Sequence, residues 1–301
     1  MKKYFFFILI SFCIVFSWNA FSQDEEKSDT VKTDTLKYQT DEVVVTGTRT
    51  NKKIIDIPYS VIRLSNKTYR YDRKTSINDV LYTVPGVFMQ SRYGNHDVRI
   101  SIRGFGSRSN SGIRGVRILL DGIPESEPDG QTRIEAIDFN SIGSIEIVKG
   151  NSSSLYTNAP GGVVNFINDI NFPNDFFVLF NDFGSYNLRR NGFKTGIRTD
   201  DYSFLATYTY HNYKGYREHS EDYWHIINTV LETTPGKNTN LQFLGYFTTG
   251  LIRLPGSLTK SEYDADPFQA AKREKDFDYR RISKKGRVGL RINSKFGNTL
   301  N

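Results

Sequence analysis

The chain contains 301 residues, of which 38% are hydrophobic, 24% charged and 14% aromatic, and its formal charge is +7. This composition is too apolar for a disordered chain, and a single cysteine excludes a disulfide framework or a CxxC metal site. No run of about 18 apolar residues follows the first 22 positions, which excludes an internal transmembrane helix. The positive charge admits a nucleic-acid or membrane-surface partner without selecting one.

The first 22 residues have the pattern of a secretory signal peptide. Lys2 and Lys3 precede an apolar run from Tyr4 to Trp18, and Ala20-Phe21-Ser22 supplies small residues for cleavage. A membrane-anchoring helix is the alternative. Cleavage after this segment would remove both lysines, lower the charge from +7 to +5, and leave no cysteine. We therefore expect an exported protein.

The composition of the remaining chain changes near residue 170. Residues 23–53 are expected to form a leader, of which residues 23 to about 40 are polar and without periodicity, as is typical of a flexible segment. There are 11 aromatic residues among the 149 from 23 to 171, but 23 among the 130 from 172 to 301. We expect one domain over residues 54–169 and a different, aromatic-rich structure over residues 170–301.

Residues 54–169 carry the signals of a compact α+β domain. Thr75 or Ser76 can cap a short helix that ends at Pro85-Gly86. Its apolar residues share one face: Ile77, Val80, Leu81 and Val84. Four segments are predicted strands, at 98–103, 115–120, 144–148 and 162–167.

The second half alternates with a period of two residues. Between 203 and 210, one face would carry Phe204, Ala206, Tyr208 and Tyr210, and the other Ser203, Leu205, Thr207 and Thr209. Similar segments occur at 176–181, 188–198, 241–248 and 287–293. Strands of about ten residues with aromatic ends favour the wall of an outer-membrane β-barrel. A soluble β-sandwich uses the same alternation and is the alternative.

A short strand-prone segment lies between the polar leader and the α+β domain. It comprises Asp41, Glu42, Val43, Val44, Val45 and Thr46. An isolated segment of this kind suits pairing with a strand of another protein, although it could also be the first strand of the following domain. It resembles the TonB box of TonB-dependent outer-membrane receptors, whose strand is taken up by the periplasmic protein TonB.

The following residues resemble the plug domain of the same receptors. The motifs occur in the family's order, at 57–61, 80–87, 100–106, 118–124, 145–150, 154–156 and 161–165. Lys149-Gly150-Asn151 departs mildly from the usual Arg-Gly-Pro. The resemblance implies an α+β plug domain over 54–169, followed over 170–301 by antiparallel transmembrane strands of the N-terminal part of a β-barrel.

The stretch 103–131 resembles a subgroup of receptors for iron complexes and for pyrroloquinoline quinone. This resemblance implies ligand-facing plug loops that include Arg92, Tyr93, Arg108, Asn110, Arg114, Glu127 and Gln131. The arginines could instead pair with acids of the barrel and seat the plug. The resemblance also implies a lock between plug and barrel formed by Arg103, Glu146 and Lys149.

Other kinds of site are not supported by their spacing. His211, His219 and His225 lie near Glu218, Glu221 and Asp222, but they match no zinc signature, and we interpret them as a polar extracellular loop without metal. No Gly-x-Ser-x-Gly elbow supports catalysis, so we expect no enzyme and no cofactor. The basic residues follow no nucleic-acid-binding motif.

The predicted function is transport across the cell outer membrane. We expect a TonB-dependent receptor that imports a scarce small ligand, a ferric siderophore or other iron chelate, with TonB and its inner-membrane energising complex as partners. Alternatives are a receptor for an organic cofactor such as pyrroloquinoline quinone, a truncated non-transporting binding module, and a secreted hydrolase. Because a plugged barrel needs about 22 strands, and 130 residues supply roughly six to eight, we expect an incomplete barrel and a fragment of a longer receptor.

Overall fold

The computed structural model describes residues 44–45, 52–53, 56–69, 71–106, 112–135, 137–236 and 238–294. Two short strands, β1 (Val44–Val45) and β2 (Lys52–Lys53), pair antiparallel ahead of the main structure. None of the described helices is long and apolar enough to cross a membrane.

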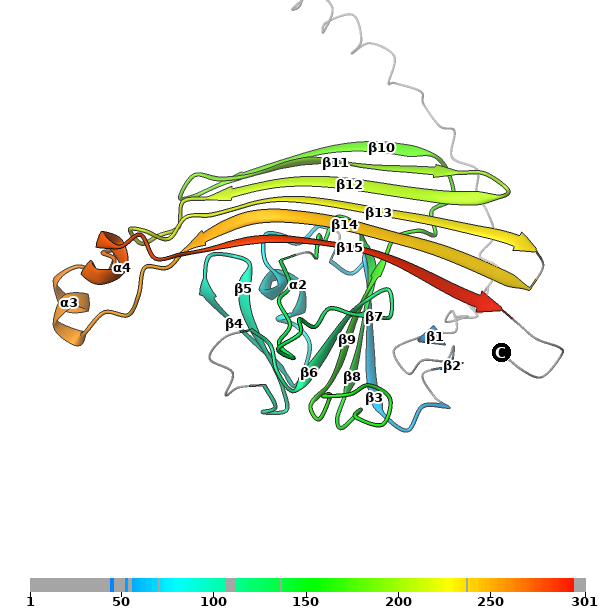
Figure 1. The fold of residues 1–301 in the computed structure, drawn as a ribbon, viewed down its shortest axis with the longest axis horizontal. Helices are drawn as coiled ribbons and strands as arrows, with labels where there is room; N and C mark the ends of the chain where they lie inside the picture. The colour runs from blue at the N-terminus through cyan, green and yellow to red at the C-terminus, as the bar shows by residue number, and fades with distance from the viewer. Residues whose placement is uncertain are drawn as a thin grey trace, which may run out of the picture. The chain divides into compact units, whose positions relative to one another are not determined.

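The plug is the α+β part of the chain, built around a five-stranded sheet of order β3-β8-β9-β6-β7 (Figure 1). Only β6 and β9 run parallel; the other neighbours in this sheet are antiparallel. A separate hairpin is formed by β4 and β5. The elements are β3 (Ser60–Ser65), α2 (Ile77–Leu81), β4 (Val87–Tyr93), β5 (Asp97–Ile102), β6 (Val116–Leu120), β7 (Ile123–Pro124), β8 (Ile142–Lys149) and β9 (Gly162–Asn168).

Helix α2 begins as its sequence predicts. The Ser76 hydroxyl accepts a hydrogen bond from the Asn78 amide at 3.3 Å, and the Asp79 carboxylate accepts one from the Ser76 amide at 3.1 Å. This capping box satisfies amides that a helix start leaves free. The buried face of the helix packs into the main plug core, which also contains residues of β5, β6, β8 and β9.

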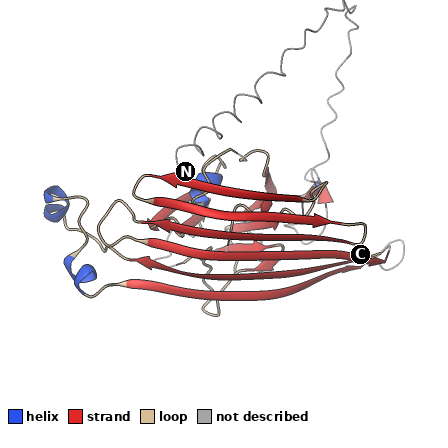
Figure 2. Cartoon of the chain, turned by 90° about the horizontal axis from the view of Figure 1, so that it is seen from above, coloured by secondary structure: helices blue, strands red, loops and turns tan. Residues whose placement is uncertain are grey.

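The wall is a six-stranded antiparallel sheet in which every strand pairs with its neighbour in sequence (Figures 1 and 2). Its edges are β10 and β15, so the sheet is open. The strands are β10 (Phe176–Gly184), β11 (Leu188–Arg198), β12 (Tyr202–Tyr213), β13 (Asp222–Gly236), β14 (Thr239–Arg253) and β15 (Arg280–Ser294). Figure 2 shows α3 (Lys260–Ala265) and α4 (Lys272–Asp276) at one end, in the connection between β14 and β15.

The two faces of the wall differ because side chains alternate along each strand. On β12, Leu205, Thr207 and Thr209 are buried toward the plug, whereas Phe204 and Tyr208 lie on the other face, as the sequence predicts. The outward face of the neighbouring strands exposes large apolar side chains: Ile227, Leu231, Phe243, Phe247, Ile282, Val288, Leu290 and Ile292. The predicted fold class, a plug followed by antiparallel barrel-type strands that do not close, is confirmed.

One part of the sequence interpretation is wrong. The histidines and acids between 211 and 225 do not all lie in a polar loop, because β12 continues to Tyr213 and β13 begins at Asp222. His211 and Asp222 are buried inward-facing strand residues, and His225 lies on the outward side of β13. Only residues 214–221 connect the two strands.

The apolar outward face predicts a depth-dependent penalty for charge. Phe247, near the middle of β14, is 48% exposed on this face. Phe247→Arg should lower the free energy of unfolding in lipid vesicles by about 2–4 kcal/mol, as for lipid-facing arginine at the bilayer midplane. The matched control is Tyr223→Arg at the end of β13, which should cost about 0–1 kcal/mol. Equal, small effects at both positions would contradict a lipid-facing wall.

Candidate functional site

The candidate site is the interface between the plug and the inward face of the wall. Along β15, Arg281, Lys285, Arg287 and Arg291 lie at odd positions and therefore share one face. This face is directed to the plug, because all four side chains contact plug atoms. Three of them form ion pairs with plug acids, so the interface is held by opposite charges from residues far apart in the chain.

Glu125 lies at the centre of the most enclosed of these contacts. Its side chain is 1% exposed and forms an ion pair with Arg287. The Tyr246 hydroxyl of β14 donates a hydrogen bond of 2.8 Å to the other carboxylate oxygen. The guanidinium of Arg287 also lies 5.0 Å from the centre of the Tyr246 ring, a cation–π distance. One plug carboxylate is thus held by two wall strands.

Three further plug acids contact the same face of β15. The Arg281 guanidinium lies 2.7 Å from a Glu135 carboxylate oxygen and 3.7 Å from Asp97. Lys285 lies 3.5 Å from Glu127, which also pairs with Arg133 of the plug at 3.3 Å.

The other wall strands hold the plug through a second group of polar contacts. On β12, the Thr209 hydroxyl donates to Asp138 at 2.7 Å, and Arg190 of β11 lies 3.5 Å from the same carboxylate. The amide of Asn228 on β13 donates to Ser141 and to Asn168, each at 2.7 Å. The interface therefore extends across β11 to β15.

Burial perturbs the acids at this interface. Loss of hydration raises the pKa of Glu135, although the nearby Arg281 charge opposes the rise. Burial also raises the pKa of Asp121 to about 6, against hydrogen bonds from Asn168 that favour its ionised form. The backbone carbonyl of Asp121 accepts a hydrogen bond of 3.4 Å from Arg291. The plug thus presents carboxylates whose charge is costly unless wall cations remain in place.

A groove of about 860 Å³ lies at one end of the interface, between plug residues 71–75 and strands β10 and β11. Its volume is within the range of small-molecule sites. It is lined by aromatic and charged side chains that include Tyr71, Asp72, Arg73, Lys74, Phe180, Asp182, Phe183, Tyr186, Arg190 and Tyr213. Three cations face two carboxylates, so the lining carries a net formal charge of +1.

The structure describes only part of the predicted TonB box. Val44 and Val45 form β1, which pairs with Lys52–Lys53, whereas Asp41, Glu42, Val43 and Thr46 lie outside the described residues. The role of this segment stays a prediction.

The predicted ligand-facing residues are spread over several environments. Arg108 and Asn110 lie outside the described residues, and for Arg92 and Tyr93 only the backbone of β4 is described. Arg114 is exposed, whereas Gln131 is buried and Glu127 pairs with Arg133 and Lys285. Their assignment to a ligand remains a prediction.

The predicted lock residues have plug neighbours. The Lys149 ammonium donates to the carbonyl of Pro85 at 3.1 Å, and the Arg103 amide donates to Gly86 at 3.0 Å. Glu146 is buried on β8, opposite Arg63 of β3 and Asn165 of β9. The lock stays a prediction, while the ion pairs described above join plug and wall directly.

Sequence reasoning missed most residues of the interface. Glu135 and Asp138 lie between recognised motifs, Glu125 lies in the stretch 103–131 but was not given a role, and the partners of all three are more than 50 residues away. A signal was nevertheless present in β15, where cations at 281, 285, 287 and 291 share one face, while the other face carries Ile282, Val288, Leu290 and Ile292 together with Arg280 and Lys284. A strand face with four cations predicts an acidic surface opposite them.

The Glu125–Arg287 pair allows a direct test of the interface. Arg287→Met should destabilise the plug by about 3–5 kcal/mol, because it leaves a buried carboxylate without its partner. The double variant Arg287→Met/Glu125→Gln should recover much of this loss. The measurement is urea unfolding in detergent, followed by a fluorophore on a cysteine introduced at the exposed plug residue Ser153. Additive effects of the two substitutions would contradict the direct contact.

The raised pKa of Asp121 predicts a pH dependence. Between about pH 4 and pH 6 the folded protein holds more protons at Asp121 than the unfolded chain does, so the free energy of unfolding should fall as pH rises. A shift from 3.8 to about 6 corresponds to about 3 kcal/mol. Asp121→Asn should remove most of this slope in the same fluorescence assay, whereas substitution of the exposed Asp129 by Asn should leave it.

Comparisons with known proteins agree with this architecture. Residues 53–163 match the family model of the TonB-dependent receptor plug domain. The chain is 30% identical over 129 residues to the vitamin B12 transporter BtuB of Vibrio vulnificus. This alignment covers 42% of the chain and 20% of that protein. The chain is also 25% identical over 210 residues to the ferrichrome outer membrane transporter/phage receptor of Escherichia coli. This second alignment covers 67% of the chain and 27% of that protein.

A solved structure shows the same fold. The unliganded ferric citrate transporter FecA superposes with a TM-score of 0.65 and 20% identity, covering 79% of this chain and 38% of that one. The chain thus spans about a fifth to a quarter of the length of the two curated relatives. All three similar proteins are named as transporters. Residues 53–163 therefore form a TonB-dependent receptor plug domain, as the resemblance in the sequence predicts, and barrel-type strands follow it.

Proposed function

We propose that the protein is a TonB-dependent receptor of the cell outer membrane that imports a small metal chelate, with a ferric siderophore or other iron chelate as the leading ligand. The observation that carries this proposal is the charged plug–wall interface. A plug domain lies against a sheet with an apolar outward face and a polar inward face, and the two are joined by ion pairs and hydrogen bonds.

The charged contacts of the interface favour a transporter with a displaceable plug over a protein in which the plug is a permanently fixed scaffold. Buried ion pairs contribute little net stability compared with apolar packing, but they specify one arrangement of their partners. A plug seated in this manner is well positioned and can still be displaced as a unit, because its apolar core consists of plug residues except for Tyr246 of the wall. A transporter needs both properties.

The ligand class is supported by the similar proteins and by the groove. Two of the three similar proteins are named for iron complexes, ferrichrome and ferric citrate, and one for vitamin B12. The groove beside residues 71–75 offers aromatic surfaces and a net formal charge of +1, which suits a partly apolar chelate that carries negative charge. Within this proposal residues 54–169 are the plug and residues 170–301 belong to the barrel.

Energy coupling is assigned to residues 41–46. In the proposed cycle, ligand binding makes this segment available to TonB, which pairs with it and remodels the plug. No covalent bond of the ligand changes. The long connections at residues 214–221 and 254–279 lie at the same end of the wall, and outer-membrane barrels place their longer loops outside the cell. The groove, lined by Tyr186 and Tyr213 at that end, would face the medium.

Deletion of residues 41–46 tests this function. The full-length protein, expressed in cells lacking other receptors, should bind iron-labelled ferrichrome or ferric citrate at the cell surface, and cyanocobalamin serves as the non-iron comparison. The deletion should abolish energised uptake and leave surface binding unchanged. A matched control is replacement of an equal number of residues within the leader, at 28–33, which should preserve uptake.

Three outcomes would be informative. Uptake that survives deletion of residues 41–46 would overturn the coupling role. Binding without uptake in the unmodified protein would favour a binding module. Uptake of cyanocobalamin in preference to both ferric chelates would replace the iron chelate by an organic ligand.

A further inference from the structure

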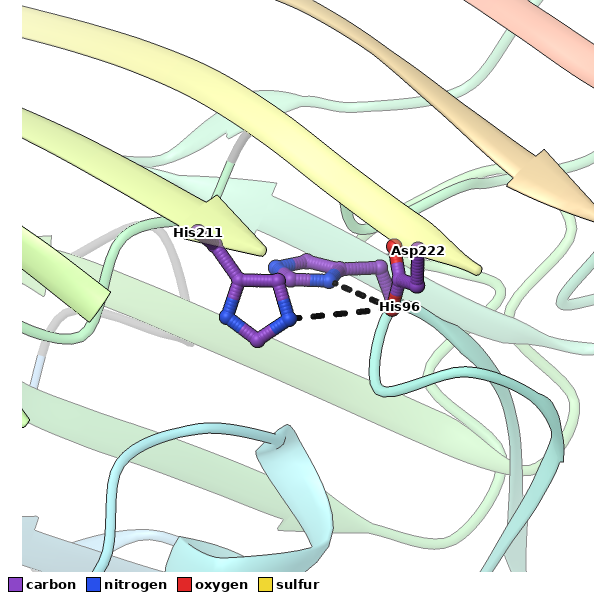
Figure 3. A group of neighbouring side chains, drawn as sticks. All are labelled: His96, His211 and Asp222. Atoms are coloured by element: carbon purple, nitrogen blue, oxygen red, sulfur yellow. Dashed lines mark hydrogen bonds and ion pairs between the residues drawn. The ribbon is translucent and has the colours of Figure 1, made fainter. Parts of the chain in front are cut away.

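A cluster of two imidazoles and one carboxylate joins the plug to the wall at the loop end of the strands (Figure 3). His96 lies in the plug, in the connection of the β4–β5 hairpin, while His211 lies on β12 and Asp222 on β13. One potential ligand atom from each residue lies within 4.8 Å of the other two. Figure 3 shows the three side chains directed toward a common point.

The distances in the cluster suit a small cation. His96 Nδ1 lies 3.2 Å from Asp222 Oδ2, and His211 Nε2 lies 3.9 Å from the same oxygen. Tetrahedral zinc, with bonds of about 2.0–2.2 Å, separates its ligand atoms by about 3.3 Å. To hold such an ion, His211 must move closer to Asp222, and the two imidazole nitrogens, which lie within 4.8 Å of each other, must approach by up to about 1.5 Å.

His211 is the least satisfied member of the cluster. It is 1% exposed, and its Nδ1 has no hydrogen-bond partner among the described residues. Its Nε2 makes a marginal contact of 3.5 Å with the side-chain amide nitrogen of Asn95. A buried imidazole normally has partners at its ring nitrogens. The unpartnered nitrogen is Nδ1, whereas Nε2, the nitrogen nearest Asp222, has only long contacts of 3.5 Å to Asn95 and 3.9 Å to Asp222, so Nε2 is available to a metal ion.

The carboxylate is held in a fixed orientation by neighbours of the kind that support metal ligands. The Trp224 indole N–H donates a hydrogen bond to Asp222 Oδ1, and the backbone N–H of Asn95 donates one of 2.6 Å to Oδ2. Gly94 permits this approach of the hairpin, since its φ is +58° and a Cβ there would overlap the Asp222 carboxylate. The hairpin is therefore shaped to bring His96 against the wall.

Space for a further ligand lies beside the imidazoles. A cavity of about 20 Å³ is lined by Asn95, His96 and His211 together with Asp138 and Thr209. This volume is enough for one water molecule. The lining is partly polar and partly apolar, since it also includes Ile77, Ile134, Ile137, Phe139 and Ile226. Arg190 also lines the cavity, but its charge is offset by Asp138 and Asp182, with which it pairs.

We propose that His96, His211 and Asp222 form a binding site for one divalent transition-metal ion of the zinc type, with water as the fourth ligand, that ties the plug hairpin to β12 and β13. Imidazole nitrogen and carboxylate oxygen are the donors that such ions accept. The bound ion adds a bond across the plug–wall interface at the end of the wall with the long connections.

Metal binding by the full-length, tag-free protein in detergent tests the proposal. After removal of metal with a chelator, the unmodified protein should bind one more equivalent of Zn²⁺ in calorimetry than the His96→Gln or His211→Gln variant, each of which should weaken this site at least about tenfold. Co²⁺ bound at the site should give the visible absorption of a tetrahedral ion, and this absorption should be lost in both variants.

The control is His225→Gln, because His225 lies on β13 three residues from Asp222 but on the outward side of the strand. This variant should bind Zn²⁺ as the unmodified protein does. His96→Gln changes a hairpin residue rather than a wall strand, so its fold can be verified by the heat-dependent mobility of the barrel. Equal Zn²⁺ binding by all four proteins, or no binding by the unmodified protein, would overturn the site.

Discussion

The structure depends on a boundary between plug and wall at which charges are buried. Glu125, Glu135 and Asp138 on the plug are nearly inaccessible, and each is compensated by a wall cation or a wall hydroxyl. Removing either partner of such a pair is costly, yet the intact pair contributes little beyond what apolar packing would supply. The boundary therefore specifies where the plug lies more than it stabilises the folded chain, and the apolar core of the plug supplies its internal stability.

The need to compensate buried plug charges also explains why the two faces of the wall strands differ in polarity. A strand whose side chains alternate must satisfy lipid on one face and a charged domain on the other. In β15, Val288 and Leu290 are exposed outward while Arg287 and Arg291 reach plug oxygens. A shift of register by one residue would exchange the two faces, exposing arginine to lipid and placing leucine against buried carboxylates. The ion pairs thus also fix the register of the wall relative to the plug.

Helices and strands could be predicted from the sequence more reliably than the contacts between residues far apart in the chain. Strands β5, β6, β8 and β9, helix α2 and the alternation of β12 follow from local periodicity, and local periodicity is visible in one chain. Strand β13 was missed because polar residues interrupt its alternation: Asn228 contacts the plug, whereas His225 and Thr229 lie on the outward face among apolar residues. The pairing of Glu135 with Arg281, across 146 positions, could not be derived from spacing, since it depends on how two distant segments of the chain meet.

The cluster of His96, His211 and Asp222 forms a set of potential metal ligands only where the plug meets the wall, because neither part supplies all three residues. His211 and Asp222 have no metal spacing along the chain, and neither strand contains a third ligand close to them. The third ligand, His96, comes from a hairpin that belongs to a separate two-stranded sheet of the plug. Asp97 of the same hairpin contacts Arg281, so this short segment touches β12, β13 and β15. Any movement of the plug away from the wall must break these contacts together, including the bonds to a metal ion held among them.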